Sequence, residues 1–141
     1  MSKKVLILCT GNSCRSQMAE GFLKSFDPGL EVYSAGVNPA EKINPNTVVV
    51  MNEAGIDVSK GVPKDVSLFT GETFDYVITV CDNAKESCPV FTGKVKNNIH
   101  LGFVDPYEAK GTKEEILNEY REVRDEIKRS FRHFYDTKLK S

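Results

Sequence analysis

A short segment near the amino terminus combines the residue types needed to bind a tetrahedral anion and to attack it. The segment reads Cys9-Thr10-Gly11-Asn12-Ser13-Cys14-Arg15-Ser16. The guanidinium of Arg15 can hold two oxygens of an oxyanion with its planar fork, and its positive charge favours the thiolate form of Cys9. Ser16 can donate a hydrogen bond to that thiolate. The sequence therefore predicts an oxyanion site in which Cys9 is the nucleophile.

The elements on either side of this segment are those that an anion site requires. Residues 5–8, Val-Leu-Ile-Leu, are typical of a strand buried on both faces of a parallel sheet, and apolar residues then recur at helical spacing from Met18 to Phe26. A loop that enters a helix can turn its backbone N–H groups toward an anion, and we expect Gly11 to permit the backbone angles. The predicted anion-binding residues are Thr10, Gly11, Asn12, Ser13, Cys14 and Arg15.

Taken alone, Cys9 could equally be a buried core thiol at the end of a strand. Gly11, Arg15 and Ser16 in the same short segment favour the nucleophile instead, because a core thiol needs none of them.

The rest of the chain alternates predicted strands with predicted helices. Further strands are expected at residues 31–35, 76–80 and 98–103, with helices at 45–54 and from 113 onward, and a loop with a short helix between 56 and 71. Asn44-Pro45 has the form of a helix start, and Thr112 with Glu115 forms a capping box. The apolar stripe predicted to face the core from the last helix is Ile116, Tyr120, Val123, Ile127, Phe131 and Phe134.

This order of elements predicts one α/β domain over residues 1–141. We expect three layers, with a central, mainly four-stranded parallel sheet and helices on both faces. Ligands of such sheets bind beyond the carboxyl ends of the strands. Cys9 and Cys81 both follow predicted strands at that edge.

Composition places the chain among ordinary globular domains. The formal charge is -1, and 40% of the residues are hydrophobic and 28% charged. A near-neutral chain offers no broad attraction to nucleic acid or to anionic membranes, and the apolar run from Val5 to Cys9 is too short for a signal peptide or a membrane span. We expect a cytoplasmic monomer that binds neither nucleic acid nor membrane. Because cytoplasmic thiols stay reduced, catalytic, redox or metal-binding roles are favoured for the four cysteines.

Cys81 and Cys88 flank a polar stretch, and three interpretations of this pair compete. As zinc ligands with Cys9 and Cys14, the second pair has six intervening residues instead of the usual two to four, and Arg15 would oppose the cation. The two could also be incidental buried thiols. The favoured interpretation is a redox relay, in which two resolving cysteines pass oxidation outward from Cys9 by thiol-disulfide exchange.

Residues 9–21, Cys-Thr-Gly-Asn-Ser-Cys-Arg-Ser-Gln-Met-Ala-Glu-Gly, resemble the signature of thioredoxin-coupled arsenate reductases. That family shares the fold of low-molecular-weight tyrosine phosphatases. The similarity continues through residues 32–36, Asn44-Pro45, the region of Cys81 and Cys88, and residues 121–127, and so covers nearly the whole chain.

The resemblance implies a mechanism of three cysteines. Cys9 attacks arsenate, with phosphate or sulfate as competing anions, and forms a covalent adduct. Cys81 then attacks Cys9 and releases arsenite, and Cys88 attacks Cys81 to give a disulfide that thioredoxin reduces. Cys14 has no place in these steps and is expected to pack within the loop.

The resemblance also implies roles for residues outside the loop. Asp105, which precedes Pro106, would protonate the leaving oxygen, although an Asp-Pro pair is also common in surface turns. No tightly bound cofactor is implied, apart from a potassium ion that some members of the family bind. Its predicted ligands are Asn12, Glu20, Ser34 and Asp65; these residues could equally make local hydrogen bonds.

Two other function classes stay open at this point. A low-molecular-weight tyrosine phosphatase would need only Cys9, Arg15 and Asp105, and Tyr107 after Pro106 is typical of the phosphatases. Gln17 favours the reductase, because the phosphatases have proline after the serine of the loop. A thiol sensor or metal-binding module, the third class, would not need the arginine and serine of the loop.

Overall fold

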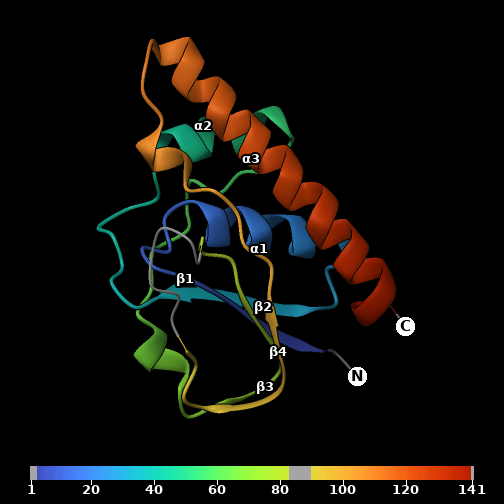
Figure 1. Ribbon diagram of the computed structural model, residues 1–141. Helices are drawn as coiled ribbons and strands as arrows, with labels where there is room; N and C mark the ends of the chain where they lie inside the picture. Colours follow the sequence, from blue (N-terminus) through green and yellow to red (C-terminus); the bar gives the residue numbers. More distant parts are fainter. Residues whose placement is uncertain (1–2, 83–89, 141) are drawn as a thin grey trace.

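Four parallel strands form one sheet in the computed structural model, which describes residues 3–82 and 90–140 (Figure 1). In space the strands follow the order β2-β1-β3-β4, and every neighbouring pair is parallel. Their bounds are Lys4–Cys9 for β1, Glu31–Gly36 for β2, Thr73–Thr79 for β3 and Lys94–His100 for β4. The carboxyl ends of β1 and β3 therefore lie side by side, which brings Cys9 and Cys81 to the same edge.

The alternation of side chains along β1 divides the core between the two faces of the sheet. Val5 and Ile7 join the larger cluster, which lies under the three α-helices, whereas Leu6 and Leu8 point to the opposite face. α1 lies against the sheet and α3 packs over α1 and α2, as Figure 1 shows. The bounds of these helices are Arg15–Phe26 for α1, Pro45–Glu53 for α2 and Lys113–Phe134 for α3.

The second face of the sheet is covered by a short 3-10 helix, η1, at Val66–Phe69. Phe69 from this helix packs with Phe74, and Phe91 joins them in the same buried cluster. The predicted parallel α/β sheet is therefore confirmed, with helical elements on both faces but with all the long helices of the described residues on one.

The long helix α3 follows its sequence pattern closely. The Thr112 side chain accepts a hydrogen bond from the Glu115 backbone, and the Glu115 side chain accepts one from the Thr112 backbone, which confirms the capping box. Tyr120, Val123, Ile127, Phe131 and Phe134 are buried as predicted, while Leu117 rather than Ile116 is the buried residue of the first turns. The helix then continues as the π-helical turn η3, Tyr135–Leu139.

Both β3 and β4 were predicted as strands, but their predicted boundaries differ from those in the structure. β3 begins at Thr73, and β4 lies at Lys94–His100 rather than at residues 98–103. β4 is an edge strand that pairs only with β3, and most of its side chains are exposed. Only Val95 and Ile99 of this strand pack against the core, so its lysines and asparagines hide the apolar pattern that would mark a buried strand.

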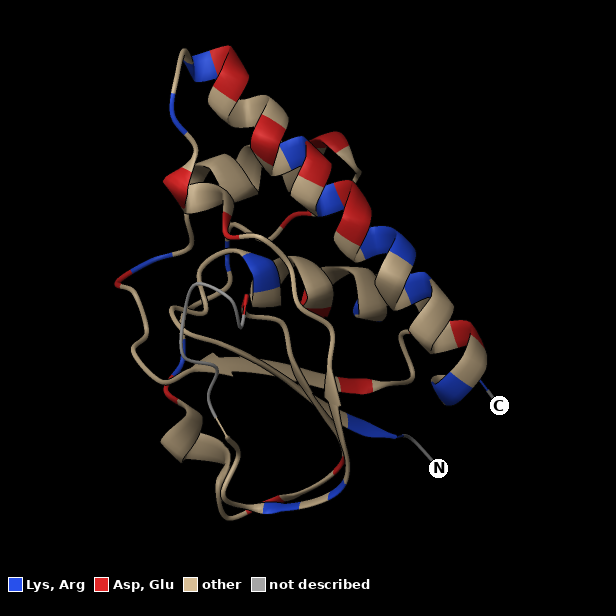
Figure 2. Cartoon of the chain, viewed as in Figure 1, with Lys and Arg blue, Asp and Glu red and all other residues tan. Residues whose placement is uncertain are grey.

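The long helix α3 carries charges of both signs. Figure 2 shows acidic and basic residues interspersed along the outer surface of α3. Among the described residues, no helix is both long enough and apolar enough to cross a membrane.

Candidate active site

The backbone of the predicted oxyanion loop is held from outside by a neighbouring segment. Three N–H groups of residues 37–44, which we name the bracing segment, donate to carbonyl oxygens of the loop. The pairs are Asn38 N to Thr10 O, Ala40 N to Gly11 O and Asn44 N to Ser13 O, each at 3.0 Å. Because the C=O and N–H of one peptide unit point in opposite directions, the N–H groups that follow these carbonyls face the inside of the loop. The loop therefore has the geometry of a nest, a backbone arrangement that favours anions.

Asn12 gives the loop its shape. Its φ of 51° lies in the left-handed region, which asparagine tolerates better than most residues, and it is completely buried. Its side-chain amide donates to Ser16 Oγ at 2.8 Å and accepts from the backbone N of Lys64 at 2.8 Å. Gly11, which we expected to supply the unusual angles, does not have a positive φ. The expectation about Gly11 is wrong because the turn is made one residue later, where the amide side chain also stabilises it.

A glycine is required elsewhere, at the end of β2. A Cβ atom at Gly36 would collide with the carbonyl oxygen of Thr10, so the absence of a side chain lets β2 approach the loop. Gly36 N also donates to Lys64 O at 2.8 Å. Besides the bracing segment, residues 36 and 64 also hold the loop: Gly36 packs against Thr10, and Lys64 N donates to the Asn12 side chain.

Two hydrogen-bond donors converge on the sulfur of Cys9. Asn12 N lies 3.1 Å from Cys9 Sγ, and Ser16 Oγ lies 2.9 Å from it. Because Ser16 Oγ already accepts from the Asn12 amide, the Ser16 hydroxyl proton is available to Cys9. Both donors suit a sulfur that carries negative charge, as the predicted nucleophile must.

The structure brings Arg15 and Asp105 together, although they are 90 positions apart in the sequence. Arg15 is only 3% exposed; its Nη1 donates to Phe103 O at 3.1 Å, and its Nη2 lies 3.5 Å from Asp105 Oδ2. The other oxygen of Asp105 accepts from Tyr107 N at 3.0 Å, which starts the 3-10 helix η2, Pro106–Glu108. Asp105 therefore lies beside the loop, and its Asp-Pro turn is not an isolated surface feature.

A cavity of about 320 Å³ joins these groups. The predicted loop residues line it together with Asp105. Four further residues that were not predicted as anion ligands complete the wall: Asn38, Ala40, Asn44 and Tyr107. Asn44 was recognised only as a helix start, which it is, since its side chain accepts from Asn46 N. Asn44 reaches the cavity wall because of the way α2 packs, and this packing cannot be predicted from the neighbouring residues in the sequence.

Cys14 is a buried thiol. Burial raises its pKa to about 12, against a lowering by Arg15 and by the Thr47 hydroxyl. The side chain is therefore protonated throughout the physiological range and is a poor nucleophile. Within residues 3–82 and 90–140, no group of three or more His, Cys, Asp or Glu side chains is arranged to hold a metal ion.

The second cysteine pair is described only in part. β1 and β3 remain paired close to their carboxyl ends: Leu8 lies opposite Thr79, and Val80 N donates to Leu8 O at 2.9 Å. Cys9 and Cys81 are the residues that follow Leu8 and Val80, so the two cysteines lie at neighbouring strand ends. Cys81 is fully buried and disulfide-bonded, whereas Cys9 and Cys14 are free thiols. Cys88 lies outside the described residues.

The predicted potassium ligands make contacts of their own. Ser34 Oγ donates to Glu20 Oε1 at 2.5 Å, while the Asn12 side-chain oxygen accepts from the Lys64 backbone. The exposed Asp65 carboxylate accepts from Ser67 N and caps η1. Two of the four residues thus meet and the other two are engaged elsewhere. The potassium site stays a prediction, and no step below depends on it.

Comparison with known proteins places this site in a class. The model of the family described as low molecular weight phosphotyrosine protein phosphatase matches residues 4–141. The chain therefore belongs to the low molecular weight phosphotyrosine protein phosphatase family, as the loop and the parallel sheet had indicated.

Within that family, the chain is similar to arsenate reductases. It is 47% identical over 139 residues to the arsenate reductase of Shouchella clausii strain KSM-K16, a match that covers 97% of this chain and 99% of the relative. A solved arsenate reductase in the oxidized state superposes with a TM-score of 0.77 at 29% identity, covering 93% of this chain and 95% of the other. Another, in the phosphate binding state, gives a TM-score of 0.74 at 28% identity, covering 95% and 97%.

Proposed function

We propose that this protein reduces arsenate to arsenite and is regenerated by thioredoxin, acting as a cytoplasmic monomer. The observation that carries the proposal is the pair of donors on Cys9 Sγ, inside a loop whose carbonyl oxygens are turned outward and whose cavity contains Arg15. This arrangement suits a tetrahedral oxyanion above a thiolate. The similarity to arsenate reductases, one of them solved with phosphate, favours arsenate as that oxyanion.

In the first step, the Cys9 thiolate attacks the arsenic atom. A sulfur–arsenic bond forms and an arsenic–oxygen bond breaks, while Arg15 and the N–H groups of the loop hold the remaining oxygens. Asp105, after it takes up a proton from solvent, transfers that proton to the departing hydroxyl oxygen of arsenate, which leaves as water. The ion pair with Arg15 keeps the Asp105 side chain at the anion cavity.

In the second step, the thiolate of Cys81 attacks the Cys9 sulfur. A disulfide forms between the two, the sulfur–arsenic bond breaks, and its electron pair stays on arsenic, which leaves as arsenite in the +3 state. Cys88 then attacks Cys81 and frees Cys9, and thioredoxin supplies two electrons to reduce the Cys81–Cys88 disulfide. A disulfide-bonded Cys81 beside a free Cys9 is the arrangement expected after this exchange.

The experiment that tests the proposal is arsenate-dependent consumption of NADPH through thioredoxin reductase and thioredoxin. The wild-type protein should sustain many turnovers, and a Cys81→Ser, Cys88→Ser double variant should stop after forming the Cys9 adduct, which mass spectrometry can detect. Sustained turnover by the double variant would exclude the relay. Gel filtration with light scattering tests whether the protein is a monomer in solution.

One observation favours phosphatase activity as a second candidate. Tyr107 is 75% exposed and also lines the anion cavity, so its ring can contact an aromatic group attached to a bound phosphate. Cys9, Arg15 and Asp105 suffice for hydrolysis through a phosphocysteine, without Cys81 or Cys88. Turnover of an aryl phosphate, compared with that of arsenate plus thioredoxin on one preparation, separates the two activities; a preference for the aryl phosphate would reverse our assignment.

A further inference from the structure

A chain of hydrogen bonds connects α3 to the oxyanion loop. The Asn44 side-chain amide donates to Tyr120 Oη at 3.0 Å, and the Asn44 backbone N donates to Ser13 O at 3.0 Å. Tyr120 lies on the core-facing side of α3 and is only 1% exposed. The sequence pattern marked Tyr120 as an ordinary core residue, yet its hydroxyl is one residue away from a wall of the anion cavity.

The position of the bracing segment depends on its two ends. Between Gly36 and Asn44 most side chains are exposed, and only Ile43 is buried. Gly36 is fixed by its place in β2. At the other end, Asn44 caps α2 with its side-chain oxygen and contacts Tyr120 with its side-chain nitrogen. The contact with Tyr120 therefore links this end of the bracing segment to α3.

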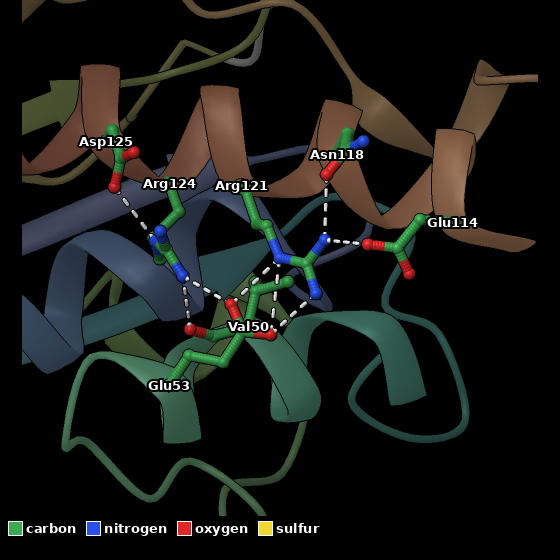
Figure 3. A network of polar contacts seen from close by, with 7 residues as sticks. All are labelled: Val50, Glu53, Glu114, Asn118, Arg121, Arg124 and Asp125. Atoms are coloured by element: carbon green, nitrogen blue, oxygen red, sulfur yellow. Dashed lines mark hydrogen bonds and ion pairs between the residues drawn. The ribbon is translucent and has the colours of Figure 1, made fainter.

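The opposite end of α2 is attached to α3 by a different kind of contact. Figure 3 shows Glu53 between Arg121 and Arg124, at 2.8 Å and 2.9 Å respectively, and Arg124 Nη1 also donates to Val50 O at 2.9 Å. None of these residues lines the anion cavity. These ion pairs can hold the two helices together, but it is the Asn44 end of α2 that contacts the loop, through Ser13 O.

We propose that Tyr120 is a positioning residue for the oxyanion loop, acting through Asn44. Without the hydroxyl, the Asn44 amide nitrogen loses its acceptor and the start of α2 can shift. The Ser13 carbonyl would follow, because Asn44 N holds it, and the N–H of Cys14 in the same peptide unit would turn away from the anion. A group that never touches the substrate would thus control the direction of a donor that does.

The phenol suits this task over a wide pH range. Burial raises the pKa of Tyr120 to about 12, with further contributions in the same direction from Cys14 and Asp105. The hydroxyl therefore stays protonated and neutral at physiological pH. As a neutral group it accepts the Asn44 hydrogen bond without placing a negative charge near the anion cavity.

The inference rests on the anion-binding part of the proposed function, and inorganic phosphate is the probe that tests it. The dissociation constant of phosphate is measured by calorimetry for the wild type, for Tyr120→Phe and for the control Tyr135→Phe. Tyr135 donates to Asp27 Oδ2 at 3.0 Å, at the far end of the helical layer, so the control removes a comparable hydroxyl. Tyr120→Phe should weaken phosphate binding about 5- to 10-fold, the effect of one hydrogen bond, and Tyr135→Phe should not.

A second variant separates positioning from a general loss of stability. Asn44→Ser keeps an oxygen that can cap α2 and removes the nitrogen that contacts Tyr120. Asn44→Ser should weaken phosphate binding by a similar factor, and the double variant with Tyr120→Phe should bind no more weakly than the weaker single variant. The midpoint of thermal unfolding should differ little between the Tyr120 and Tyr135 variants.

Three outcomes would overturn the proposal. Wild-type affinity for phosphate in Tyr120→Phe, or fully additive losses in the double variant, would exclude the path through Asn44 while leaving the proposed function intact. Failure of the wild type itself to bind phosphate would instead remove the anion site, and with it both the proposed function and this inference.

Discussion

The two ends of α2 carry polar networks that differ in burial and in charge balance. At the amino-terminal end, Asn44 joins a loop in which Arg15 is 3% exposed and donors surround a cavity. At the carboxyl-terminal end, Glu53 lies near the surface between two arginines that neutralise it. The first network therefore surrounds a cavity beside the Arg15–Asp105 ion pair, whereas the second consists of side chains that pair directly with one another.

The two networks also differ in what they contribute to the free energy of folding. Burying a guanidinium and several backbone donors is unfavourable unless strong acceptors meet them, and an oxyanion meets several at once. Ion pairs exposed to solvent contribute about 0–1 kcal/mol at most positions. Changes in the loop should therefore alter function strongly, and changes in the Glu53 cluster should alter only stability, and only slightly.

The largest effect is expected from removing Asp105, the proton donor that we propose for the loop site. Asp105→Asn keeps the shape of the side chain but cannot supply a proton to the leaving oxygen, so adduct formation at Cys9 should slow by about 10²- to 10⁴-fold. Rapid-quench mass spectrometry of the adduct measures this step directly. Phosphate binding should persist; an unchanged rate of adduct formation would remove Asp105 from the mechanism.

A smaller but still large effect is expected when the fork of Arg15 is lost while its charge is kept. Arg15→Lys should lower kcat/KM for arsenate by about 10²- to 10³-fold, because lysine cannot hold two oxygens in one plane. The matched control is Arg124→Lys in the Glu53 cluster, which should leave kcat/KM within about twofold, since Arg124 does not line the cavity. Equal losses in the two variants would contradict the comparison.

Within the loop itself, the two free thiols should differ in reactivity. Iodoacetamide at pH 8 should modify Cys9 and leave Cys14 intact, because the pKa of Cys14 is raised to about 12 by burial. Peptide mapping by mass spectrometry in the Cys81→Ser, Cys88→Ser background identifies the modified thiol. Preferential labelling of Cys14 would show that Cys9 is not the activated sulfur.

The smallest effect is expected in the Glu53 cluster, and only in acid. Hydrogen bonds from Arg121 and then Arg124 lower the pKa of Glu53 from 4.5 to about 2. A depressed pKa in the folded state stabilises the protein above about pH 4.5, and this stabilisation is lost as pH falls toward 2. Glu53→Gln should flatten the loss of stability over that range, measured by urea unfolding, without changing turnover at pH 7. A steep, unchanged acid transition would indicate that Glu53 is not responsible.

Local patterns were sufficient to predict much of this molecule. The run before Cys9, the apolar spacing after it, the Asn44-Pro45 helix start and the Thr112–Glu115 box each depend on residues close in sequence, and each is confirmed. The parallel sheet follows from the alternation of strands and helices. The start of the edge strand β4 was predicted too late in the chain, because most of its side chains are exposed and polar.

The sequence by itself determined which atoms can do chemistry: a cysteine, an arginine and a serine between a buried strand and a helix. The tertiary structure decided how those atoms are held. Asp105 meets Arg15 because β4 and η2 return to the same edge, and the carbonyls of the loop point outward because Asn38, Ala40 and Asn44 lie beside it. These contacts join residues far apart in the chain through backbone groups that every residue type carries, so side-chain identity gives no signal for them.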